Sequence, residues 1–157
     1  MEEDGLPAYD FVSENASFQG FEVQGGADII TWGAYKISAD ALFEYVRAKT
    51  DTGNLPRIPP LSILSGIEAD SERFKMRLEL DYAARQNQLG TGEVPTDDYA
   101  LLNAFATVKS PRGAQNVRLK LSVMNILNAE ARQHTSYLKD NVPLPGRNVR
   151  VSISTLF

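Results

Sequence analysis

The single histidine of the chain, His134, is the side chain whose type most suggests a chemical role. Glu130 precedes it by four positions, and on a short helical turn residues i and i+4 share a face, so the two could form a weak zinc contact. A zinc site takes further His, Cys or carboxylate ligands, and the chain has no cysteine. We therefore expect His134 to be a surface-loop residue packed under Leu138, and we assign no metal ligand.

Arg57 is the second candidate for ligand contact. It lies among prolines at positions 56, 59 and 60, which stiffen the chain around it. Its guanidinium could meet an anionic ligand at the mouth of a pore, or anchor its loop through a carboxylate, and the second interpretation is favoured. Arg57, Glu130 and His134 are thus the candidate ligand-loop residues.

Enzymatic chemistry is not indicated. With one histidine and no Gly-x-Ser-x-Gly segment, the serines have no partners for a nucleophilic triad. Gly25 and Gly26 precede no expected helix and make a poor phosphate cradle. Glu79 and Asp81 lie among Lys and Arg, where charge compensation is the plain interpretation. The net charge of -4 is unsegregated and gives no support for nucleic-acid binding. We expect neither an enzyme nor a cofactor.

The elements that must position these residues are strands. In residues 73–85 apolar and charged side chains alternate, as side chains do across a strand. The apolar set is Phe74, Met76, Leu78, Leu80 and Tyr82, and the charged set is Lys75, Arg77, Glu79 and Asp81. The same period predicts an all-β antiparallel meander of about seven strands, near residues 17–30, 34–47, 60–70, 73–86, 98–109, 115–125 and 146–157.

Strand length and loop length both favour a membrane-spanning barrel wall. The strands exceed the mode of about 5–6 residues for soluble proteins and reach the roughly 9–11 residues of a tilted membrane-crossing strand. Long loops at 48–59, 87–97 and 126–145 alternate with short turns at 31–33, 71–72 and 110–114. Such alternation is typical of transmembrane barrels, whose short turns are periplasmic. It places the C-terminus in the periplasm.

Aromatic side chains near the strand ends predict two interfacial girdles. The residues expected at the short-turn end are Trp32, Tyr35, Phe74 and Phe157, and those expected at the long-loop end are Tyr45, Tyr82 and Tyr99. The opposite face carries charges of both signs, including Arg118 and Lys120, which we expect to form ion pairs along the wall.

Two alternatives stay open. Alternating strands also build soluble β-barrel binding modules and sandwiches. A porin-like or adhesin barrel would share the membrane fold without energy coupling. No apolar run approaches the roughly 20 residues of a membrane helix, and residues 1–5 lack the basic and apolar regions of a signal peptide.

Residues 125–140, followed by Val-Pro-Leu-Pro-Gly-Arg-Asn at 142–148, resemble the end of TonB-dependent outer-membrane receptors. In that family a penultimate strand ends in Asn-apolar-apolar-Asn or Asp, a loop with Pro-Gly-Arg follows, and a last strand closes on a terminal aromatic. Gly20-Phe21-Glu22 is similar to the family's recurrent Gly-x-Glu strand opening. Residues 55–60 and 134–140 resemble the subgroup that contains zinc-uptake receptors.

The resemblance implies a barrel of about 22 strands with an N-terminal plug in a Gram-negative outer membrane. Residues 1–157 would be the C-terminal part of that barrel, without the plug and the earlier strands. The implied function is TonB-dependent uptake of a metal ion or metal chelate. The implied partners are outer-membrane lipid, the TonB complex through the missing plug, and the barrel assembly machinery, whose signal the last strand resembles through Val151, Ile153 and Phe157.

Overall fold

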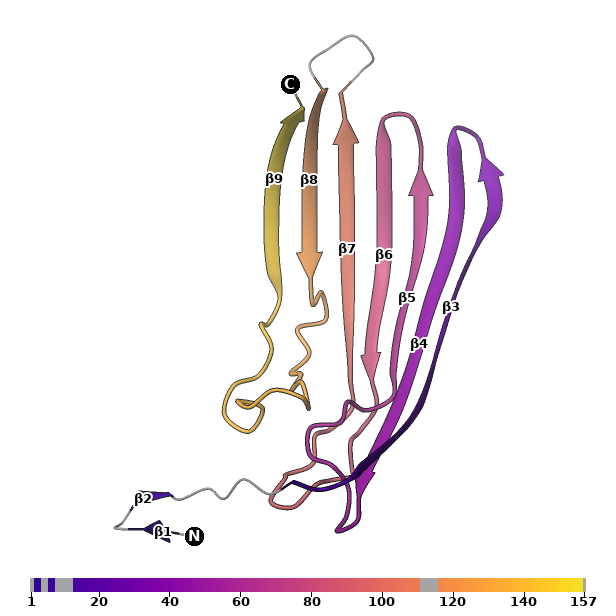
Figure 1. Ribbon diagram of the computed structural model, residues 1–157. Helices are drawn as coiled ribbons and strands as arrows, with labels where there is room; N and C mark the ends of the chain where they lie inside the picture. Colours follow the sequence, from indigo (N-terminus) through magenta and orange to yellow (C-terminus); the bar gives the residue numbers. More distant parts are fainter. Residues whose placement is uncertain (1, 4–5, 8–12, 111–115, 157) are drawn as a thin grey trace.

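Seven antiparallel strands form one sheet in which each strand pairs with the next along the chain (Figure 1). The computed structural model describes residues 2–3, 6–7, 13–110 and 116–156. The sheet consists of β3 (Ala16–Trp32), β4 (Tyr35–Thr50), β5 (Ser62–Asp70), β6 (Phe74–Ala83), β7 (Tyr99–Lys109), β8 (Asn116–Met124) and β9 (Asn148–Leu156). Two further short strands, β1 (Glu2–Glu3) and β2 (Leu6–Pro7), pair with each other. The predicted all-β meander of seven strands is confirmed.

The sheet is a single layer without an apolar core. Among the described residues only three hydrophobic residues are buried, namely Ala48, Ala83 and Ala131. The large apolar side chains of the strands stay exposed, with exposed fractions of 44% for Phe74, 44% for Leu78 and 63% for Val151. A soluble barrel or sandwich would enclose such side chains between packed layers. The described residues supply no such second layer.

The register keeps the two faces of the sheet chemically distinct. Leu78 of β6 lies opposite Ile67 of β5 and Ala104 of β7. One residue earlier, Arg77 lies opposite Glu68 and Phe105, and it points to the other face because side chains alternate. We call the face that carries Leu78 the apolar face and the face that carries Arg77 the polar face. The apolar face includes Phe21, Val23, Phe43, Ile63, Ile67, Phe74, Met76, Leu78, Leu80, Leu119, Leu121, Val149, Val151 and Ile153.

One irregularity interrupts the alternation in β3. The register shifts between Asp28 and Ile30, so that Ile30 rather than Ile29 lies opposite Ile37 of β4. A bulge of this kind adds one residue to one strand and bends it locally. The extra residue leaves both Ile29 and Ile30 about 60% exposed, and strict alternation fails there.

Aromatic side chains of the apolar face cluster at its two ends. Phe21 stacks on Phe43 with ring centroids 5.7 Å apart, and the ring of Tyr45 lies 5.8 Å from that of Phe21. Trp32 lies at the opposite end of β3 and is 77% exposed. Tyr99, however, lies opposite Ala83, one residue after the apolar-face Tyr82, so it points to the polar face. Its expected place in a girdle is wrong.

The connections alternate in length between the two ends of the sheet, as predicted. Residues 33–34 and 71–73 form short turns at one end. Residues 51–61, 84–98 and 125–147 form long loops, and Figure 1 shows them gathered at the other end. Most of the predicted turn at 110–114 lies outside the described residues. No helix in the described part of the chain is long and apolar enough to cross a membrane.

Candidate functional site

The three long loops pack on one another and form what we call the loop cluster, residues 51–61, 84–98 and 125–147. In the second loop Gln86 forms an isolated antiparallel bridge with Thr96. Its side-chain amide donates to the carbonyl of Ile58 in the first loop, at 3.0 Å. Asn54 of the first loop donates to the carbonyl of Leu89, at 3.4 Å. Hydrogen bonds from the side chains of Asn54 and Gln86 therefore join the first and second loops.

Glu93 is the main acceptor at the centre of this cluster. One carboxylate oxygen accepts the backbone N–H of Arg57 at 2.8 Å, and the other accepts the backbone N–H of Gly90 at 2.9 Å. Its side chain is 9% exposed, and hydrogen bonds to an ionised carboxylate are stronger than neutral ones. A Cβ on Gly90 would lie 2.7 Å from the backbone of Pro56, so the two loops approach closely only because residue 90 is glycine.

His134 joins the third loop to the second from a fully buried position. Its side chain is 0% exposed, and its Nδ1 lies 3.0 Å from the hydroxyl oxygen of Thr96. Its Nε2 lies 3.6 Å from a carboxylate oxygen of Glu93 and makes no hydrogen bond. Burial lowers the pKa of the imidazole, and the charge of Glu93 opposes this shift in part. The expectation that His134 is a surface residue is wrong, since its side chain has no exposed area.

The other predicted member of the histidine pair lies elsewhere. Glu130 forms an ion pair with Arg132 at 2.9 Å and is largely exposed. The structure therefore brings His134 to Glu93, not to Glu130. Among the described residues no group of three or more His, Asp or Glu side chains is placed to hold a metal ion.

Lys139 is a site residue that sequence reasoning missed. Its side chain is 6% exposed, and its Nζ donates to the carbonyl of Val94 at 2.6 Å and to Asp140 at 2.8 Å. The carbonyl of Lys139 accepts from Arg132 at 2.7 Å. The link to Val94 spans 45 positions of the chain, and no local pattern in the sequence signals it.

Arg57 is anchored through its backbone and not through its side chain. Its φ is 60°, in the left-handed region that residues other than glycine rarely adopt. Its guanidinium carbon lies 3.0 Å from the centre of the Tyr137 ring, and Tyr137 is 81% exposed. Its side chain pairs with no carboxylate in the described ranges. The predicted anchor is thus provided by its N–H, and the guanidinium stays available.

The third loop is shaped by the Asn-Ile-Leu-Asn segment at its start. Asn125 and Asn128 have φ values of 50° and 54°, in the left-handed region that asparagine tolerates better than most residues. The Asn125 side chain accepts the N–H of Ala129 and donates to its carbonyl, both at 2.9 Å. Asn128 accepts the N–H of Arg147 at 2.9 Å. The two asparagines thus close the loop back toward β9.

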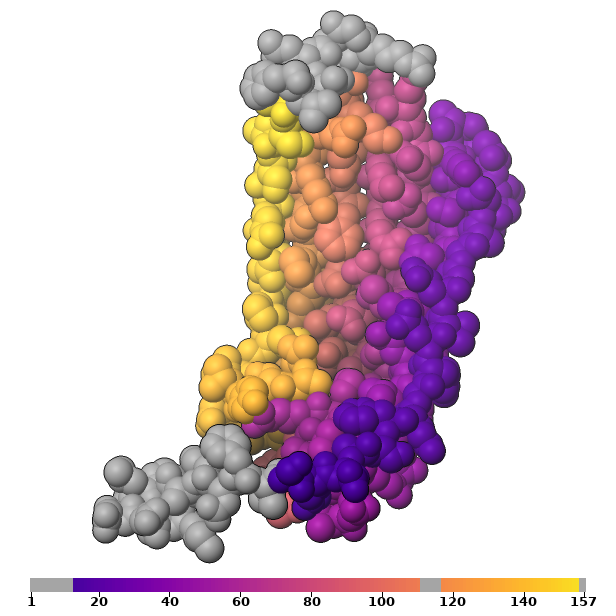
Figure 2. All heavy atoms as spheres, viewed as in Figure 1, coloured from indigo at the N-terminus to yellow at the C-terminus, as the bar shows by residue number. Residues whose placement is uncertain are grey.

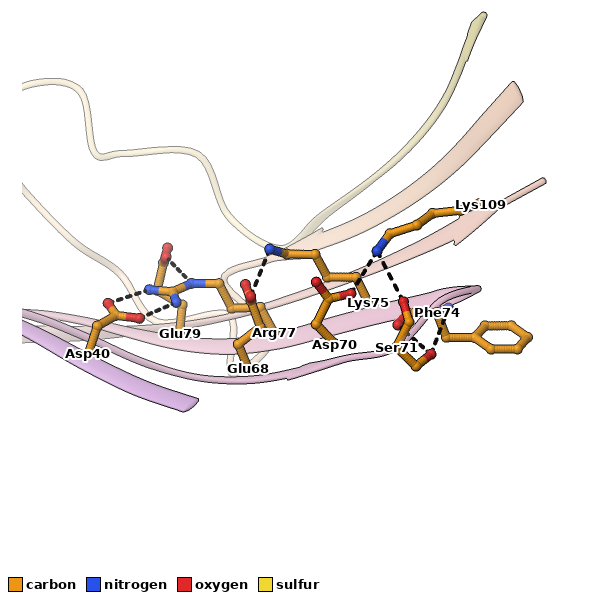
Figure 3. A network of polar contacts seen from close by, with 9 residues as sticks. All are labelled: Asp40, Glu68, Asp70, Ser71, Phe74, Lys75, Arg77, Glu79 and Lys109. Carbon is orange, nitrogen blue, oxygen red and sulfur yellow. Dashed lines mark hydrogen bonds and ion pairs between the residues drawn. The ribbon is translucent and has the colours of Figure 1, made fainter. Parts of the chain in front are cut away.

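The polar face of the sheet carries separate ion pairs that together involve four strands (Figure 3). Arg77 of β6 donates to both oxygens of Asp40 on β4, at 2.5 and 2.9 Å, and to Glu79 at 3.0 Å. The same face holds the pairs Lys75–Glu68 and Lys109–Asp70, each at 2.7 Å. The expected wall ion pairs are confirmed for Lys75, Arg77 and Glu79.

Lys120 differs from these lysines. Its Nζ lies 5.1 Å from the centre of the Phe105 ring, and neither it nor Arg118 forms an ion pair with a described residue. Lys120 lines a shallow hollow on the polar face. The hollow has a volume of about 260 Å³ and is lined by Glu68, Lys75, Arg77, Glu79, Phe105, Thr107 and Lys120.

The last strand presents the residues of the proposed assembly signal. Val151 and Ile153 of β9 lie opposite Leu121 and Leu119 of β8, on the apolar face. They are 63% and 74% exposed. Phe157 lies outside the described residues. Figure 2 shows β9 and β3 at opposite sides of the sheet, with the loop cluster across one end.

The chain was compared with known proteins. No protein-family model matches it, and no curated protein matches it at the significance required. Among solved structures it is similar to the copper transporter OprC, with a TM-score of 0.72 and 20% sequence identity over 88% of this chain and 23% of that chain. The fold of this chain is therefore like that of part of OprC. This chain spans 23% of the length of OprC, and at this identity the likeness establishes fold alone.

Proposed function

We propose that this chain forms part of the wall of a TonB-dependent outer-membrane receptor that takes up a metal ion or a metal chelate. The observation that carries the proposal is the one-layer sheet whose apolar face is covered by nothing in the described structure. Burial of apolar surface stabilises a protein by about 25 cal/mol per Å². A face as apolar as this one therefore needs a nonpolar environment, and hydrocarbon supplies it.

The dimensions of the strands support a membrane environment. Strands β5 to β9 have 9, 10, 11, 9 and 9 residues, within the roughly 9–11 residues that cross a bilayer at a tilt. The outer strands β3 and β9 each pair with one neighbour among the described residues. Because unpaired backbone groups are costly in hydrocarbon, we propose that further strands of a longer protein close the barrel.

The orientation follows from loop length. Transmembrane barrels place short turns in the periplasm and long loops outside. We propose that the loop cluster lies at the outer mouth and that β9 ends in the periplasm, where its apolar stripe serves as the signal to the assembly machinery. Contact with the TonB complex would be made by a plug that precedes the barrel.

Metal uptake is supported by the likeness to a protein named as a copper transporter. The zinc subgroup receives no support from that likeness, and the two segments that suggested it have structural roles. Arg57 binds Glu93 through its N–H, and His134 is buried against Thr96. The proposal therefore leaves out zinc specificity.

Gene deletion tests the proposal. We expect loss of the natural gene to impair growth when copper, iron or zinc is limiting, and a plasmid copy to restore growth only in cells with a working TonB. Rescue that does not depend on TonB would indicate a passive porin-like barrel instead. Normal growth of the deletion strain under every metal limitation would contradict a role in metal uptake.

A further inference from the structure

We infer that Arg47 and Lys49 form a binding site for the phosphate groups of a lipid in the outer leaflet of the membrane. The two residues lie at the end of β4 from which the first long loop departs. They lie on the face of the wall that is turned away from the polar face, so the site is separate from any path of uptake. The inference rests on the membrane placement in the proposed function.

The register places both cations on the apolar face of the sheet. Arg47 lies opposite Gln19 and Lys49 lies opposite Ser17, two and four residues beyond Tyr45 along β4. Side chains alternate along a strand, so residues at an even spacing from Tyr45 share its face. Every other charged residue in the seven described strands lies on the polar face. Two cations therefore stand where the period predicts apolar side chains.

The aromatic side chains set the height of the two cations relative to a bilayer. Tyr35 and Tyr45 lie ten residues apart on the same face of β4. At about 3.3 Å per residue and a tilt of about 45°, they are separated by roughly 23 Å along the membrane normal. The apolar band of a transmembrane barrel is about 25 Å tall and ends in aromatic girdles. Arg47 and Lys49 therefore lie roughly 5 and 9 Å beyond the girdle, within reach of the lipid headgroups.

Neither cation is neutralised by a described acid. Both side chains are exposed, and neither forms an ion pair with a described residue. Asp51 lies beyond the end of β4, and Glu14, which precedes β3, accepts a hydrogen bond from Thr52 at 3.0 Å. The residues opposite the two cations on β3 are uncharged and can donate hydrogen bonds. The patch is thus positive and suited to an anion.

The phosphate of a lipid fits this arrangement better than a soluble phosphate does. Two residues spaced by two on one face have Cα atoms about 6–7 Å apart, so their long side chains can reach the same headgroup. Phosphate accepts charge-assisted hydrogen bonds from guanidinium and ammonium groups. The stacked rings of Phe21 and Phe43, 5.7 Å apart, lie on the same face beside the cations and offer the acyl chains an apolar surface. A soluble phosphate would use the cations alone.

A photoreactive side chain on the apolar face tests the inference in a bilayer. Benzoylphenylalanine replaces Phe21 of the full-length natural protein, because Phe21 is 54% exposed and lies beside the cations. The protein is inserted into vesicles of phosphatidylcholine with a minor share of diphosphoryl lipid A, and mass spectrometry counts the adduct of each lipid after illumination. We expect the ratio of lipid A adducts to phosphatidylcholine adducts to exceed the vesicle ratio about 30-fold, or about fivefold for each cation.

Matched substitutions separate the charge of the two residues from other effects. Arg47→Gln together with Lys49→Gln should lower the adduct ratio to that of the vesicles. Arg47→Lys together with Lys49→Arg keeps both charges and should retain the enrichment. Arg118→Gln removes an arginine of the polar face and should change nothing. Inorganic phosphate in excess, at an ionic strength matched with chloride, should leave the enrichment in place.

The outcomes distinguish the inference from the proposed function. A natural protein whose adduct ratio equals the vesicle ratio would overturn the inference, while the membrane placement would stand. An enrichment that survives the double glutamine substitution would also overturn it. Loss of the enrichment in inorganic phosphate would assign the patch to a soluble anion and overturn the lipid assignment. If neither lipid is coupled, the apolar face does not meet lipid, and the inference and the proposed function are both contradicted.

Discussion

Single side chains decide how the loops of this protein hold together. His134 has one ring nitrogen 3.0 Å from the Thr96 hydroxyl and the other 3.6 Å from a Glu93 oxygen, with no exposed surface. The sequence indicated His134 as a candidate functional residue. It did not indicate the partners of His134, because Thr96 lies 38 positions away. Contacts between irregular loops follow no period, so they leave no pattern to find.

The burial of His134 makes the loop cluster sensitive to acid. Burial lowers its pKa in the folded state, whereas an imidazole in an opened loop titrates near about 6.5. As the pH falls, the opened state therefore binds more protons than the folded state. The contribution of His134 to the stability of the loop cluster is complete above about pH 6.5 and is lost below it. We expect hydrogen exchange of the loop-cluster amides, corrected for intrinsic rates, to quicken between pH 7.5 and 5.5.

His134→Gln provides the control for this effect, because glutamine can bond to Thr96 and does not titrate. Exchange from its loop cluster should depend much less on pH. An equal pH dependence in the natural protein and in this variant would mean that another group titrates.

Glu93 should contribute more to loop stability than any exposed acid nearby. Glu93→Gln replaces one acceptor oxygen by a donor that faces a backbone N–H, leaving two donors opposed. We expect a loss of about 1–3 kcal/mol in the free energy of loop opening, measured as faster proteolysis within the loops. Glu130→Gln is the matched control, since that ion pair is exposed and contributes at most about 1 kcal/mol. Similar effects of the two substitutions would contradict the central place of Glu93.

At the scale of the strands, side-chain alternation was sufficient to predict the sheet. The stripe Phe74, Met76, Leu78 and Leu80 and the charges between them lie on the faces that the period assigned. The bulge between Asp28 and Ile30 could not be predicted, because an extra residue in one strand shifts the pairing with its neighbour without any signal in the residue types. The polar-face position of Tyr99 was also missed, because residues 99–109 carry apolar side chains on both faces.

Gly66 is required by the ion pairs that cross β5. It lies between Asp40 and Glu79 in the register, and a Cβ built on it would lie 2.3 Å from the guanidinium of Arg77. Gly66→Ala should push that guanidinium away from Asp40 and cost at most about 1 kcal/mol, because the end of a flexible side chain can shift and the ion pair is partly exposed. The measurement is the temperature at which the full-length barrel unfolds.

Gly25→Ala is the matched control for Gly66. Gly25 lies in β3, and a Cβ there meets no atom within 4 Å. The unfolding temperature of the Gly25→Ala variant should equal that of the natural protein or exceed it, because alanine restricts the unfolded chain more than glycine does. Equal losses at the two positions would show that any added methyl group harms the sheet, whatever lies above it.

At the scale of the whole molecule, the proposed function rests on the environment that each face of the sheet requires. No described residue forms a layer over the apolar face, and the polar face carries ion pairs that suit a hydrated interior. Sequence alone did not decide between hydrocarbon and a dry protein core, because alternation is the same in both. The open, single-layer sheet favours hydrocarbon, and the likeness to OprC extends to the fold alone.

Spin labels on single introduced cysteines test most directly whether the apolar face meets lipid. The chain has no cysteine of its own, and the labels would be placed at Leu78 and Thr107 of the full-length protein in bilayers. We predict that the label at Leu78 collides with oxygen but not with a water-soluble nickel complex, and that the label at Thr107 shows the reverse. A label at Leu78 that reaches the nickel complex, or that neither reagent reaches, would contradict the account.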